Sequence, residues 1–376
     1  MLLYLLPAGA GIILLAIIPY IVYLFGVTFG KKPVEIDLTA PGLLPPISIV
    51  ICAYNEELTI ARKIQSISSC TYPDELTEVV LVIDCSDDKT EEVSRSELAK
   101  ANFSWKIHVN QQRSGKNTSL NTGIGLTSNE LVVATDADLV WDENSVEYLV
   151  QRILADGKCA AGTGDLQPNP GADRVTSMEK TYRSYFGRMA EWESAHDATP
   201  AFNGCLLILR KSIVGAVNET SGADDANLAY EAIRKGYRTF YETRAAIYEE
   251  LPENLKKQYT QKVRRAKGLI QTTLANRDLL KVNRPFCRVF YPLRLWMYVI
   301  TPTILLIGCV IFSAGLILNT PLLFLLLAAG FVLLSAVKQG NLITAFVTNQ
   351  FYLLAGLYSR RKDAVLWKST SKKAGE

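Results

Sequence analysis

The stretch Leu131–Asp138 reads Leu-Val-Val-Ala-Thr-Asp-Ala-Asp, an apolar run that ends in two alternate carboxylates. Residues 131–134 have the length and valine content of a strand that is buried on both faces. Open α/β sheets bind their ligands just beyond the carboxyl ends of such strands, which is where Asp136 and Asp138 would lie. Side chains two residues apart in an extended segment point the same way, so both carboxylates can face one divalent cation. A solvated, Asp-rich turn is the alternative, because a D-x-D pattern is short.

Two other short apolar runs precede this one, and both end in polar residues. Ile47–Ala53 leads into Tyr54-Asn55-Glu56, and Val79–Ile83 leads into Asp84. A helical pattern follows each run, and this spacing is typical of βαβ units and a parallel sheet. A third strand is expected at 106–110. The sequence therefore predicts an α/β fold in which acidic residues from several strand ends meet at one edge of the sheet.

A basic loop lies between the third strand and the D-x-D strand. Its sequence is Arg113-Ser114-Gly115-Lys116-Asn117, and a helical pattern follows it. Backbone N–H groups at a helix N-terminus, together with a Lys ammonium, form a natural site for a diphosphate. A solvated Lys116 in a turn is the alternative.

Apolar and acidic residues are unevenly distributed along the 376 residues. Residues 3–26 and 295–358 are mostly apolar, whereas nearly all the acidic residues lie between them. A balance of 40 Lys and Arg against 37 Asp and Glu gives no reason to expect nucleic acid as a partner. The seven cysteines form no C-x-x-C pair and there are two histidines, so we expect neither a zinc site nor a disulfide framework, and a reducing cytoplasm fits best.

The first apolar segment, Leu2–Gly26, has no charged residue and is long enough to cross a hydrocarbon core of about 30 Å as a helix. Lys31 and Lys32 follow it, and basic residues in this position place the next domain on the cytoplasmic side. A cleaved secretory signal is the alternative. That reading lacks the basic residues that normally precede the apolar stretch.

The C-terminal third predicts further membrane segments. Basic residues precede an apolar span at about 295–318, and 321–337 would return across the bilayer. Residues 341–358 are apolar, but a basic tail follows them, which favours a re-entrant or interfacial segment over another crossing. The expected divisions are a transmembrane helix at 1–28, a cytoplasmic catalytic domain at 46–250, interfacial amphipathic helices at 251–294, a transmembrane region at 295–359 and a basic cytoplasmic tail at 360–376.

The order of these motifs resembles that of family 2 glycosyltransferases, in particular the membrane-integrated branch that includes hyaluronan, cellulose and chitin synthases. The resemblance implies a GT-A fold, a Rossmann-like mixed sheet with helices on both faces, here joined to transmembrane helices. It also implies a nucleotide-sugar donor, with a UDP-sugar as the first expectation, and Mg2+ or Mn2+ held by Asp136 and Asp138. Asp84 would contact the base or ribose and Lys116 the diphosphate. The residues expected to bind the donor are Ala53, Tyr54, Asn55, Glu56, Asp84, Lys116 and Asp136.

The segment Gly222-Ala223-Asp224-Asp225-Ala226 resembles the T-E-D segment of the same family, with Asp224 in place of its Glu. The last acid of that segment is the general base, so the resemblance assigns this role to Asp225. Displacement with inversion at an anomeric carbon needs one carboxylate to take the proton of the acceptor hydroxyl. A plain helix N-cap is the alternative for either Asp.

Two other segments resemble the acceptor region of the family. Asn203-Gly204 lies in the first, and Gln261, Arg264 and Gly268 match a Q-x-x-R-W-x-x-G segment in the second. Arg265 stands where processive synthases have Trp. The loss of that aromatic side chain puts polymer binding in doubt, and a cation there suits a phospholipid or polyprenyl-phosphate acceptor.

The resemblance as a whole implies a membrane-bound, inverting glycosyltransferase that works among membrane lipids on a lipid-linked or glycan acceptor. A processive polysaccharide synthase is the close variant. Three or four spans are few for a polymer channel, so a homo-oligomer would have to build it. A non-catalytic, nucleotide-binding membrane scaffold is the alternative from a different class.

Overall fold

The computed structural model describes residues 4–30, 44–169, 174–217, 224–249, 255–336 and 342–359. These residues belong to two compact units, which are described separately. The sheet unit lies within Lys32–Gln167 and Glu193–Glu249, and the helical unit lies within Met1–Lys31, Pro168–Trp192 and Glu250–Arg361.

The sheet unit contains one eight-stranded mixed sheet with the strand order β3-β2-β1-β4-β7-β6-β8-β5. The strands β3, β2, β1 and β4 are parallel, whereas β7 is antiparallel to both β4 and β6. This mixed sheet confirms the predicted fold class. The strand bounds are β1 Ile47–Ala53, β2 Thr77–Ile83, β3 Ser104–Val109, β4 Leu131–Asp136, β5 Val140–Trp141, β6 Cys159–Pro168, β7 Leu206–Arg210 and β8 Arg238–Glu249.

The β-branched runs form strands because both of their faces are covered. Every residue of β1 and β2 is buried. The third strand begins at Ser104, two residues before the predicted start, and β4 extends to Asp136. The D-x-D motif therefore begins on the last residue of a central strand.

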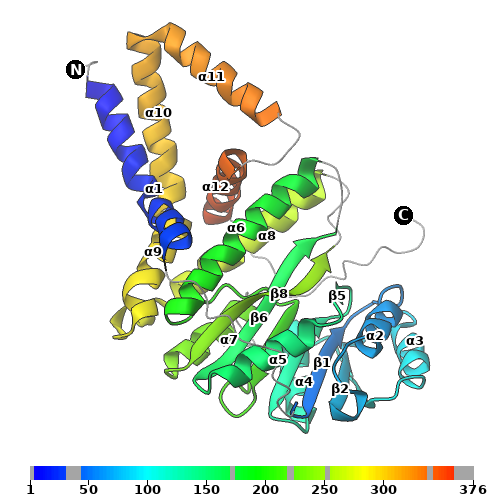
Figure 1. Cartoon of the computed structure of the whole chain (residues 1–376). Helices are drawn as coiled ribbons and strands as arrows, with labels where there is room; N and C mark the ends of the chain where they lie inside the picture. The colour runs from blue at the N-terminus through cyan, green and yellow to red at the C-terminus, as the bar shows by residue number, and fades with distance from the viewer. Residues whose placement is uncertain are drawn as a thin grey trace. The chain divides into compact units, whose positions relative to one another are not determined.

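Helices cover both faces of the sheet, as predicted, and they bury alternate residues of the same strands (Figure 1). Ile49 and Ile51 of β1 pack with one set of helices, whereas Val50 and Cys52 pack with the other. The first set is α2 Ile60–Ser68, α3 Thr90–Leu98 and α5 Ser145–Ala155, and the second is α4 Lys116–Leu126 and α7 Asp224–Arg234. A short 3-10 turn, Asp74–Leu76, precedes β2.

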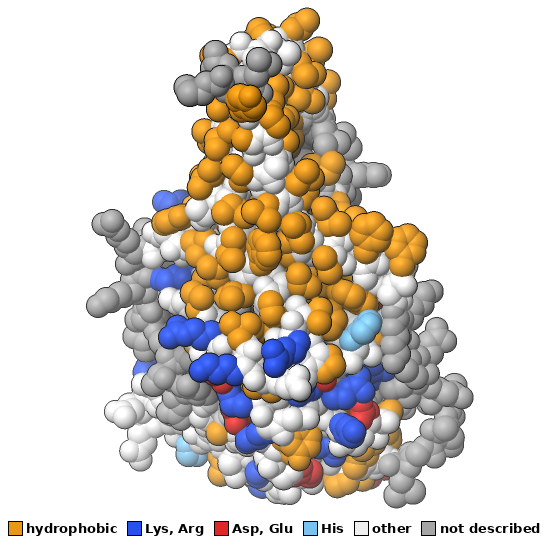
Figure 2. Space-filling view, turned by 90° about the vertical axis from the view of Figure 1, so that its left-hand side faces the viewer, with side chains coloured by type: hydrophobic (Ala, Val, Ile, Leu, Met, Phe, Trp, Pro, Cys, Tyr) orange, Lys and Arg blue, Asp and Glu red, His pale blue; other side chains and the backbone are white. Residues whose placement is uncertain are grey.

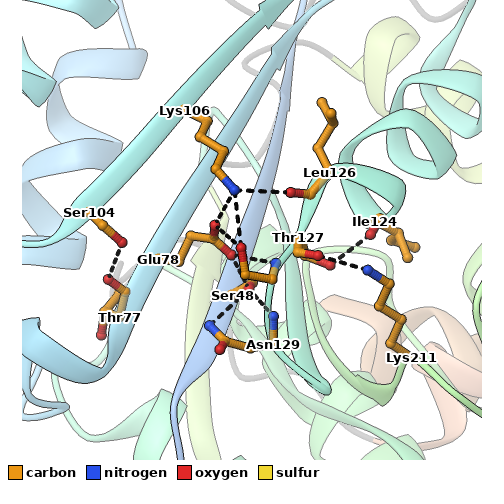
Figure 3. Close-up of polar contacts among 11 residues, drawn as sticks. Ser48, Thr77, Glu78, Ser104, Lys106, Ile124, Leu126, Thr127, Asn129 and Lys211 are labelled. Carbon is orange, nitrogen blue, oxygen red and sulfur yellow. Dashed lines mark hydrogen bonds and ion pairs between the residues drawn. The ribbon is translucent and has the colours of Figure 1, made fainter.

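A buried polar network joins the amino-terminal ends of β1 and β2 to the loop that enters β4 (Figure 3). Glu78 is 6% exposed and accepts hydrogen bonds from Ser48 Oγ, from Ser128 N at 2.8 Å and from Ser128 Oγ at 2.9 Å. Lys106 Nζ lies 2.7 Å from the same carboxylate. Burial alone would raise the pKa of Glu78, but these hydrogen bonds outweigh it and lower the pKa to about 2. The network fixes where β4 starts.

The helical unit contains two helices long and apolar enough to cross a membrane, Leu5–Phe29 and the continuous helical stretch Phe286–Asn319. Its helices are α1 Leu5–Phe29, α6 Arg174–His196 as far as Trp192, α8 Leu255–Ala275, α9 Tyr291–Leu295, α10 Thr301–Asn319, α11 Pro321–Ala336 and α12 Leu342–Tyr358. A 3-10 turn, Arg277–Lys281, follows α8, and π-helical turns at Phe286–Phe290 and Trp296–Ile300 flank α9.

Helices α1 and α10 lie side by side (Figure 1). Small residues at this contact, such as Gly308 and Gly315, let the two backbones approach closely. Many of the outward-facing residues of both helices are apolar, and Figure 2 shows a wide area of hydrophobic side chains on one face of the molecule. Outward-facing apolar side chains of this kind are typical of helices that contact lipid.

Helix α12 lies within residues 341–358, the segment that was predicted to be re-entrant or interfacial. It packs on α8 at Gly356, and Gln350 Nε2 donates to Tyr20 Oη of α1 at 2.7 Å. Its 17 residues form a shorter apolar helix than the two candidate spans. The membrane topology and the domain boundaries stay predictions, and the basic tail at 360–376 lies outside the described residues.

Candidate active site

The candidate site begins at the point where the strand order of the parallel half reverses. Strand β1 lies between β2 and β4, with Cys52 paired to Asp136 and Ala53 paired to Ile83. The chain adds β2 and β3 on one side of β1 and β4 on the other, and open α/β sheets bind their ligands beyond the carboxyl ends of the strands at such a point. The predicted residues Tyr54, Asp84 and Asp136 all follow or end these strands, so the fold gathers them at one edge.

Asp136 and Asp138 are half-buried, whereas Ala137 between them is 1% exposed. The extended geometry predicted for the motif holds only as far as Asp136, because β4 ends there and residues 137 and 138 form a turn. Lys116 Nζ lies 2.6 Å from Asp136 Oδ1, and the two side chains are 24% and 20% exposed. The Lys116 ammonium therefore forms an ion pair with the first carboxylate of the D-x-D motif.

The first turn of α4 places that lysine. Gly115 caps the helix with φ +87°, a left-handed conformation that favours glycine. Gly115 N donates to Asp84 Oδ2 at 2.9 Å and Ser114 N donates to Asp84 Oδ1 at 2.8 Å. The buried carboxylate therefore holds the turn from which Lys116 reaches Asp136.

Asp84 itself is completely buried, and its oxygens accept hydrogen bonds from the 110–115 loop. Asn110 Nδ2 donates at 2.9 Å and Arg113 Nε lies at 3.3 Å. Burial works to raise the pKa of Asp84, but the bonds from Asn110, Ser114 and Gly115 outweigh it and hold the pKa below its ordinary value. The observed role of Asp84 is to brace this loop, and its contact with a nucleotide stays a prediction.

Arg113 also covers the ring of Tyr54. Its guanidinium carbon lies 3.2 Å from the ring centroid, which is a stacked cation–π contact. Tyr54 follows β1 and Arg113 precedes α4, so the stack joins two loops at the carboxyl edge of the parallel strands. The sequence analysis predicted Tyr54 as a donor-binding residue and named Arg113 only as part of the basic loop.

The loops after β1 and β2 are joined by reciprocal bonds. Asn55 N donates to Ser86 Oγ at 3.0 Å, Asp87 N donates to Asn55 Oδ1 at 3.1 Å, and Asn55 Nδ2 donates to Asp87 Oδ1. Asn55 adopts φ +53° and Cys85 adopts φ +55°, so both chains turn sharply as they leave the sheet. These turns hold the predicted donor residues Ala53, which ends β1, and Asn55 at the carboxyl edge of the parallel strands.

Glu56, another predicted donor residue, is 1% exposed and lies just before the turn that leads into helix α2. Its carbonyl oxygen accepts from Thr59 N at 3.0 Å and Ile60 N at 2.9 Å, and its carboxylate accepts from Thr59 Oγ1 at 2.6 Å. Glu56 N donates to Thr90 Oγ1 at 2.8 Å. These contacts are structural, and a direct contact between Glu56 and a donor stays a prediction.

The proposed base, Asp225, lies next to the predicted acceptor residue Gly204. Gly204 N donates to Asp225 Oδ2 at 2.8 Å, and Ala226 N donates to Asp225 Oδ1 at 2.8 Å. A Cβ added at Gly204 would lie 3.3 Å from Lys116 Nζ and 3.6 Å from Asp225 Oδ2. Asp225, Gly204, Lys116 and Asp136 therefore form one cluster, although four different parts of the chain supply them.

Asn203 is held in a defined orientation beside this cluster. Its Nδ2 donates to the carbonyl oxygen of Gly164 at 2.6 Å, and its Oδ1 accepts from Cys205 N at 3.3 Å. Asp224 is the first residue of α7, and its side chain lies outside the described residues.

Gln261, Arg264 and Arg265 lie on α8 in the helical unit, with both arginines exposed within that unit. The neighbouring Lys262 pairs with Glu179 at 2.5 Å, and Glu179 also pairs with Arg183 at 2.6 Å. This buried ion cluster joins α6 to α8. The assignment of Gln261, Arg264 and Arg265 to an acceptor region stays a prediction.

The predicted metal site would take two ligands from the protein, the carboxylates of Asp136 and Asp138. Among the described residues no group of three or more His, Cys, Asp or Glu side chains gathers in one place. One or two carboxylates, completed by substrate phosphates and water, are the usual protein contribution to Mg2+ sites at phosphates. The ammonium on Asp136 shows that this carboxylate attracts a cation. The donor set therefore fits Mg2+ or Mn2+.

The model of the glycosyl transferase family 2 matches residues 48–216. The chain carries a family 2 glycosyltransferase domain. The match runs from β1 to just beyond β7 and includes the D-x-D motif, so the predicted family and the predicted enzyme class are confirmed.

Two curated relatives agree with this assignment. The probable glycosyltransferase YdaM of Bacillus subtilis (strain 168) is 26% identical over 260 residues, which cover 66% of this chain and 61% of that protein. A poly-beta-1,6-N-acetyl-D-glucosamine synthase of Staphylococcus epidermidis is 27% identical over 226 residues, which cover 59% of this chain and 54% of the synthase. The chain thus spans less than two thirds of the length of either relative.

A solved structure shares the fold. The mannosyltransferase PcManGT from Pyrobaculum calidifontis, in complex with GDP-Man and Mn2+, matches with a TM-score of 0.76 and 23% identity over 95% of this chain and 97% of that one. The similarity confirms the GT-A fold.

Sequence reasoning missed one charged residue close to the motif. Lys63 of α2 is 1% exposed and lies beneath the end of β4. The apolar pattern of α2 at Ile60, Ile64 and Ile67 marks position 63 as part of the buried stripe, because residues three and four apart share a helix face. From this pattern the burial of Lys63 could have been predicted.

Proposed function

We propose that the chain is a metal-dependent, inverting glycosyltransferase that moves a sugar from a nucleotide-diphosphate sugar to a lipid-linked acceptor at the membrane. One observation carries the proposal most directly. Asp136, Lys116, Gly204 and Asp225 form a single cluster at the switch point of the sheet. That cluster combines a carboxylate that is paired with a cation, a cation suited to phosphate and a second carboxylate that the Gly204 N–H orients.

The reaction follows from these groups. The carboxylate of Asp225 takes the proton of the acceptor hydroxyl while that oxygen bonds to the anomeric carbon. The bond between the anomeric carbon and the diphosphate oxygen breaks on the opposite face, and the nucleoside diphosphate leaves with the electron pair. The two N–H donors on Asp225 orient its carboxylate, and Lys116 turns from Asp136 to the diphosphate.

Asp136 and Asp138 would hold Mg2+ or Mn2+. When bound, this cation neutralises the negative charge that develops on the leaving diphosphate. The structural neighbour in complex with GDP-Man and Mn2+ supports a dependence on a divalent cation.

The proposed acceptor is a membrane lipid phosphate. Two helices of the chain are long and apolar enough to span a bilayer, which supports a membrane-embedded acceptor. Arg265 offers a cation at the α8 position where the resemblance would place an aromatic residue. Comparing Arg265→Ala with the wild type on a lipid-phosphate acceptor and on a sugar acceptor tests this assignment. Equal losses on both acceptors would contradict it.

The donor is tested by release of nucleoside diphosphate from UDP-, GDP- and dTDP-sugars with Mn2+ in the presence of membrane lipids. We expect release from one donor class by the wild type, and a loss of about 10²-fold or more for Asp138→Asn and for Asp225→Asn. Asp74→Asn, a change in the 3-10 turn before β2, is the matched control. A wild type that is silent on all donors would favour the nucleotide-binding scaffold instead.

The acceptor is tested by mass analysis of lipid extracts from cells with and without the intact protein. A new lipid that carries one sugar residue supports single transfer. A ladder of sugar masses would support the processive polysaccharide synthase, the class of the Staphylococcus epidermidis relative.

A further inference from the structure

Lys63 is a fully buried ammonium directly beneath the D-x-D strand. Its Nζ donates to Thr135 Oγ1 at 2.8 Å, and Thr135 is the residue immediately before Asp136. The same Nζ lies 3.6 Å from the ring centroid of Trp141, three residues after Asp138. One side chain of α2 thus contacts both flanks of the motif.

The contacts of Trp141 strengthen this connection to α2. Its Nε1 donates to Cys70 Sγ at 3.0 Å and lies 3.3 Å from the carbonyl oxygen of Ser66. Both partners belong to the end of α2 or the turn that follows it. The segment 136–138 is therefore fixed at both ends by the same helix.

The hydrogen-bond chain continues toward the acceptor side of the cluster. Thr135 Oγ1, which accepts from Lys63, donates its own proton to the carbonyl oxygen of Cys205 at 2.7 Å. Cys205 directly follows Gly204, whose N–H holds Asp225. Lys63, Thr135 and Cys205 therefore connect the strand end that carries Asp136 to the residue beside the proposed base.

A buried ammonium is expensive unless nearby groups stabilise it. Burial lowers the pKa of Lys63 to about 7, and Cys70, Asp136 and Asp138 limit the decrease. Lys63 donates its hydrogen bond to the neutral hydroxyl of Thr135. The carboxylates of Asp136 and Asp138 stabilise the charged form of Lys63 electrostatically. A Leu or Met would fill the same apolar stripe of α2 without this penalty, which is why the ammonium calls for a functional explanation.

We propose that Lys63 is a positioning residue for the D-x-D motif, which ties α2 to both flanks of the motif and so fixes Asp136 and Asp138 for the cation and the donor diphosphate. The proposal rests on the proposed function, because that function assigns the cation and the diphosphate to these carboxylates.

The test uses the full-length protein in detergent and measures Mn2+ binding by electron paramagnetic resonance, with and without UDP or GDP, alongside donor turnover. Lys63→Met keeps the length and the apolar stem but removes the ammonium. We expect Mn2+ and nucleotide to bind about tenfold more weakly and turnover to fall by at least as much, because the hydrogen bond to Thr135 Oγ1 and the contact with the Trp141 ring are lost. Lys100→Met, which removes a lysine from the surface after α3, should match the wild type.

A double-mutant cycle separates positioning from a general structural effect. Thr135→Val removes the hydroxyl at nearly constant volume, whereas Thr135→Ser keeps it. We expect Thr135→Val to weaken Mn2+ binding, Thr135→Ser to retain most of it, and Lys63→Met with Thr135→Val to be little worse than Lys63→Met alone, because both act through one path. If Lys63→Met does not fold, the Thr135 pair still provides the test.

Several outcomes would overturn the proposal. Unchanged or tighter Mn2+ binding by folded Lys63→Met would show that the ammonium does not position the carboxylates, and additive effects would remove the path through Thr135. A lower melting temperature with unchanged Mn2+ affinity would make Lys63 merely structural. A wild type that binds Mn2+ and nucleotide without turnover would instead contradict the proposed function, and the binding data on the variants would still decide the role of Lys63.

Discussion

The two ends of the same parallel strands use acids and lysines in opposite ways. At the amino-terminal end, Glu78 is 6% exposed and several donors, including Lys106, satisfy its carboxylate. At the carboxyl end, Asp136 pairs with Lys116 while both side chains remain partly exposed. The closed network at the first end fixes where β4 begins, and the ion pair at the other end leaves both partners accessible to a ligand.

The comparison teaches that burial and the number of hydrogen bonds separate a structural carboxylate from a binding one. A fully bonded, buried carboxylate stabilises the fold, because removing a partner leaves a buried polar group unsatisfied. A partly exposed carboxylate that is paired with a displaceable cation can exchange that cation for a ligand. Variants at the two ends should therefore change different measured quantities.

Asp136→Asn is expected to have the largest effect. It removes the charge that pairs with Lys116 and that would hold the cation, so donor turnover should fall about 10³-fold, with a change of less than about 0.5 kcal/mol in the free energy of unfolding. Turnover and thermal unfolding of the same preparation measure both quantities. A large loss of stability would show that the carboxyl end of the sheet is as structural as the other end.

Glu78→Gln is the matched change at the other end. It should lower the free energy of unfolding by about 3 kcal/mol, because the donors around position 78 lose a buried charged partner. Turnover per folded molecule should stay within about twofold of the wild type, since the network lies at the opposite end of the strands from the site. Glu92→Gln, a change at an exposed position of α3, is the control, and a loss of turnover without a loss of stability would contradict the comparison.

The free energy of unfolding should depend on pH through the carboxylate of Glu78. The pKa of Glu78 is lowered to about 2 in the folded state, so its contribution is fully present above the unfolded value of about 4.3 and is lost as the pH falls toward 2. The difference in unfolding free energy between the wild type and Glu78→Gln should therefore shrink by about 3 kcal/mol across this window. Denaturant unfolding at several pH values measures it, and a constant difference would contradict the assignment.

Gly204→Ala tests whether turnover requires a residue without a side chain between Lys116 and Asp225, at the carboxyl end of the parallel strands. The added Cβ would lie 3.3 Å from Lys116 Nζ and 3.6 Å from Asp225 Oδ2, between the groups proposed to meet the diphosphate and the acceptor. We expect turnover to fall about tenfold with little change in stability, because small displacements at a reacting centre are costly. Gly125→Ala, where a Cβ would meet nothing within 4 Å, is the matched control.

Lys106→Met should have the smallest effect. Lys106 is 51% exposed, so its pair with Glu78 is partly screened and its loss should change the unfolding free energy by about 0.5–1 kcal/mol. A loss as large as that of Glu78→Gln would mean that the lysine, and not the backbone and hydroxyl donors, dominates the network. Thermal unfolding of the two variants side by side decides between them.

The sequence predicted much of the sheet unit because its signals are local. The runs at 47–53, 79–83 and 131–134 are apolar, β-branched and followed by polar turns, so their strands and the shared edge of the sheet could be derived. The predicted third strand, 106–110, was displaced by two residues at its start because Ser104 and Trp105 continue the pairing with β2, and pairing is a tertiary property.

The roles of individual acids were harder to derive. The sequence treats Glu56, Asp84 and Asp136 alike, as polar residues that end a strand. The structure buries Glu56 and Asp84 in loop contacts and leaves Asp136 partly exposed beside Lys116. The number of donors that surround a carboxylate depends on neighbouring loops, and no local pattern contains that number.

The sequence by itself determined the family, the parallel strands and the edge of the sheet where the D-x-D motif lies, because periodicity and motif order are properties of the chain alone. Only the tertiary structure decided that Asp225 lies beside Gly204 and that Lys63 lies beneath Thr135. These pairs are separated by 21 and 72 residues, and only the packing of α7 and α2 on the sheet brings them within hydrogen-bond distance.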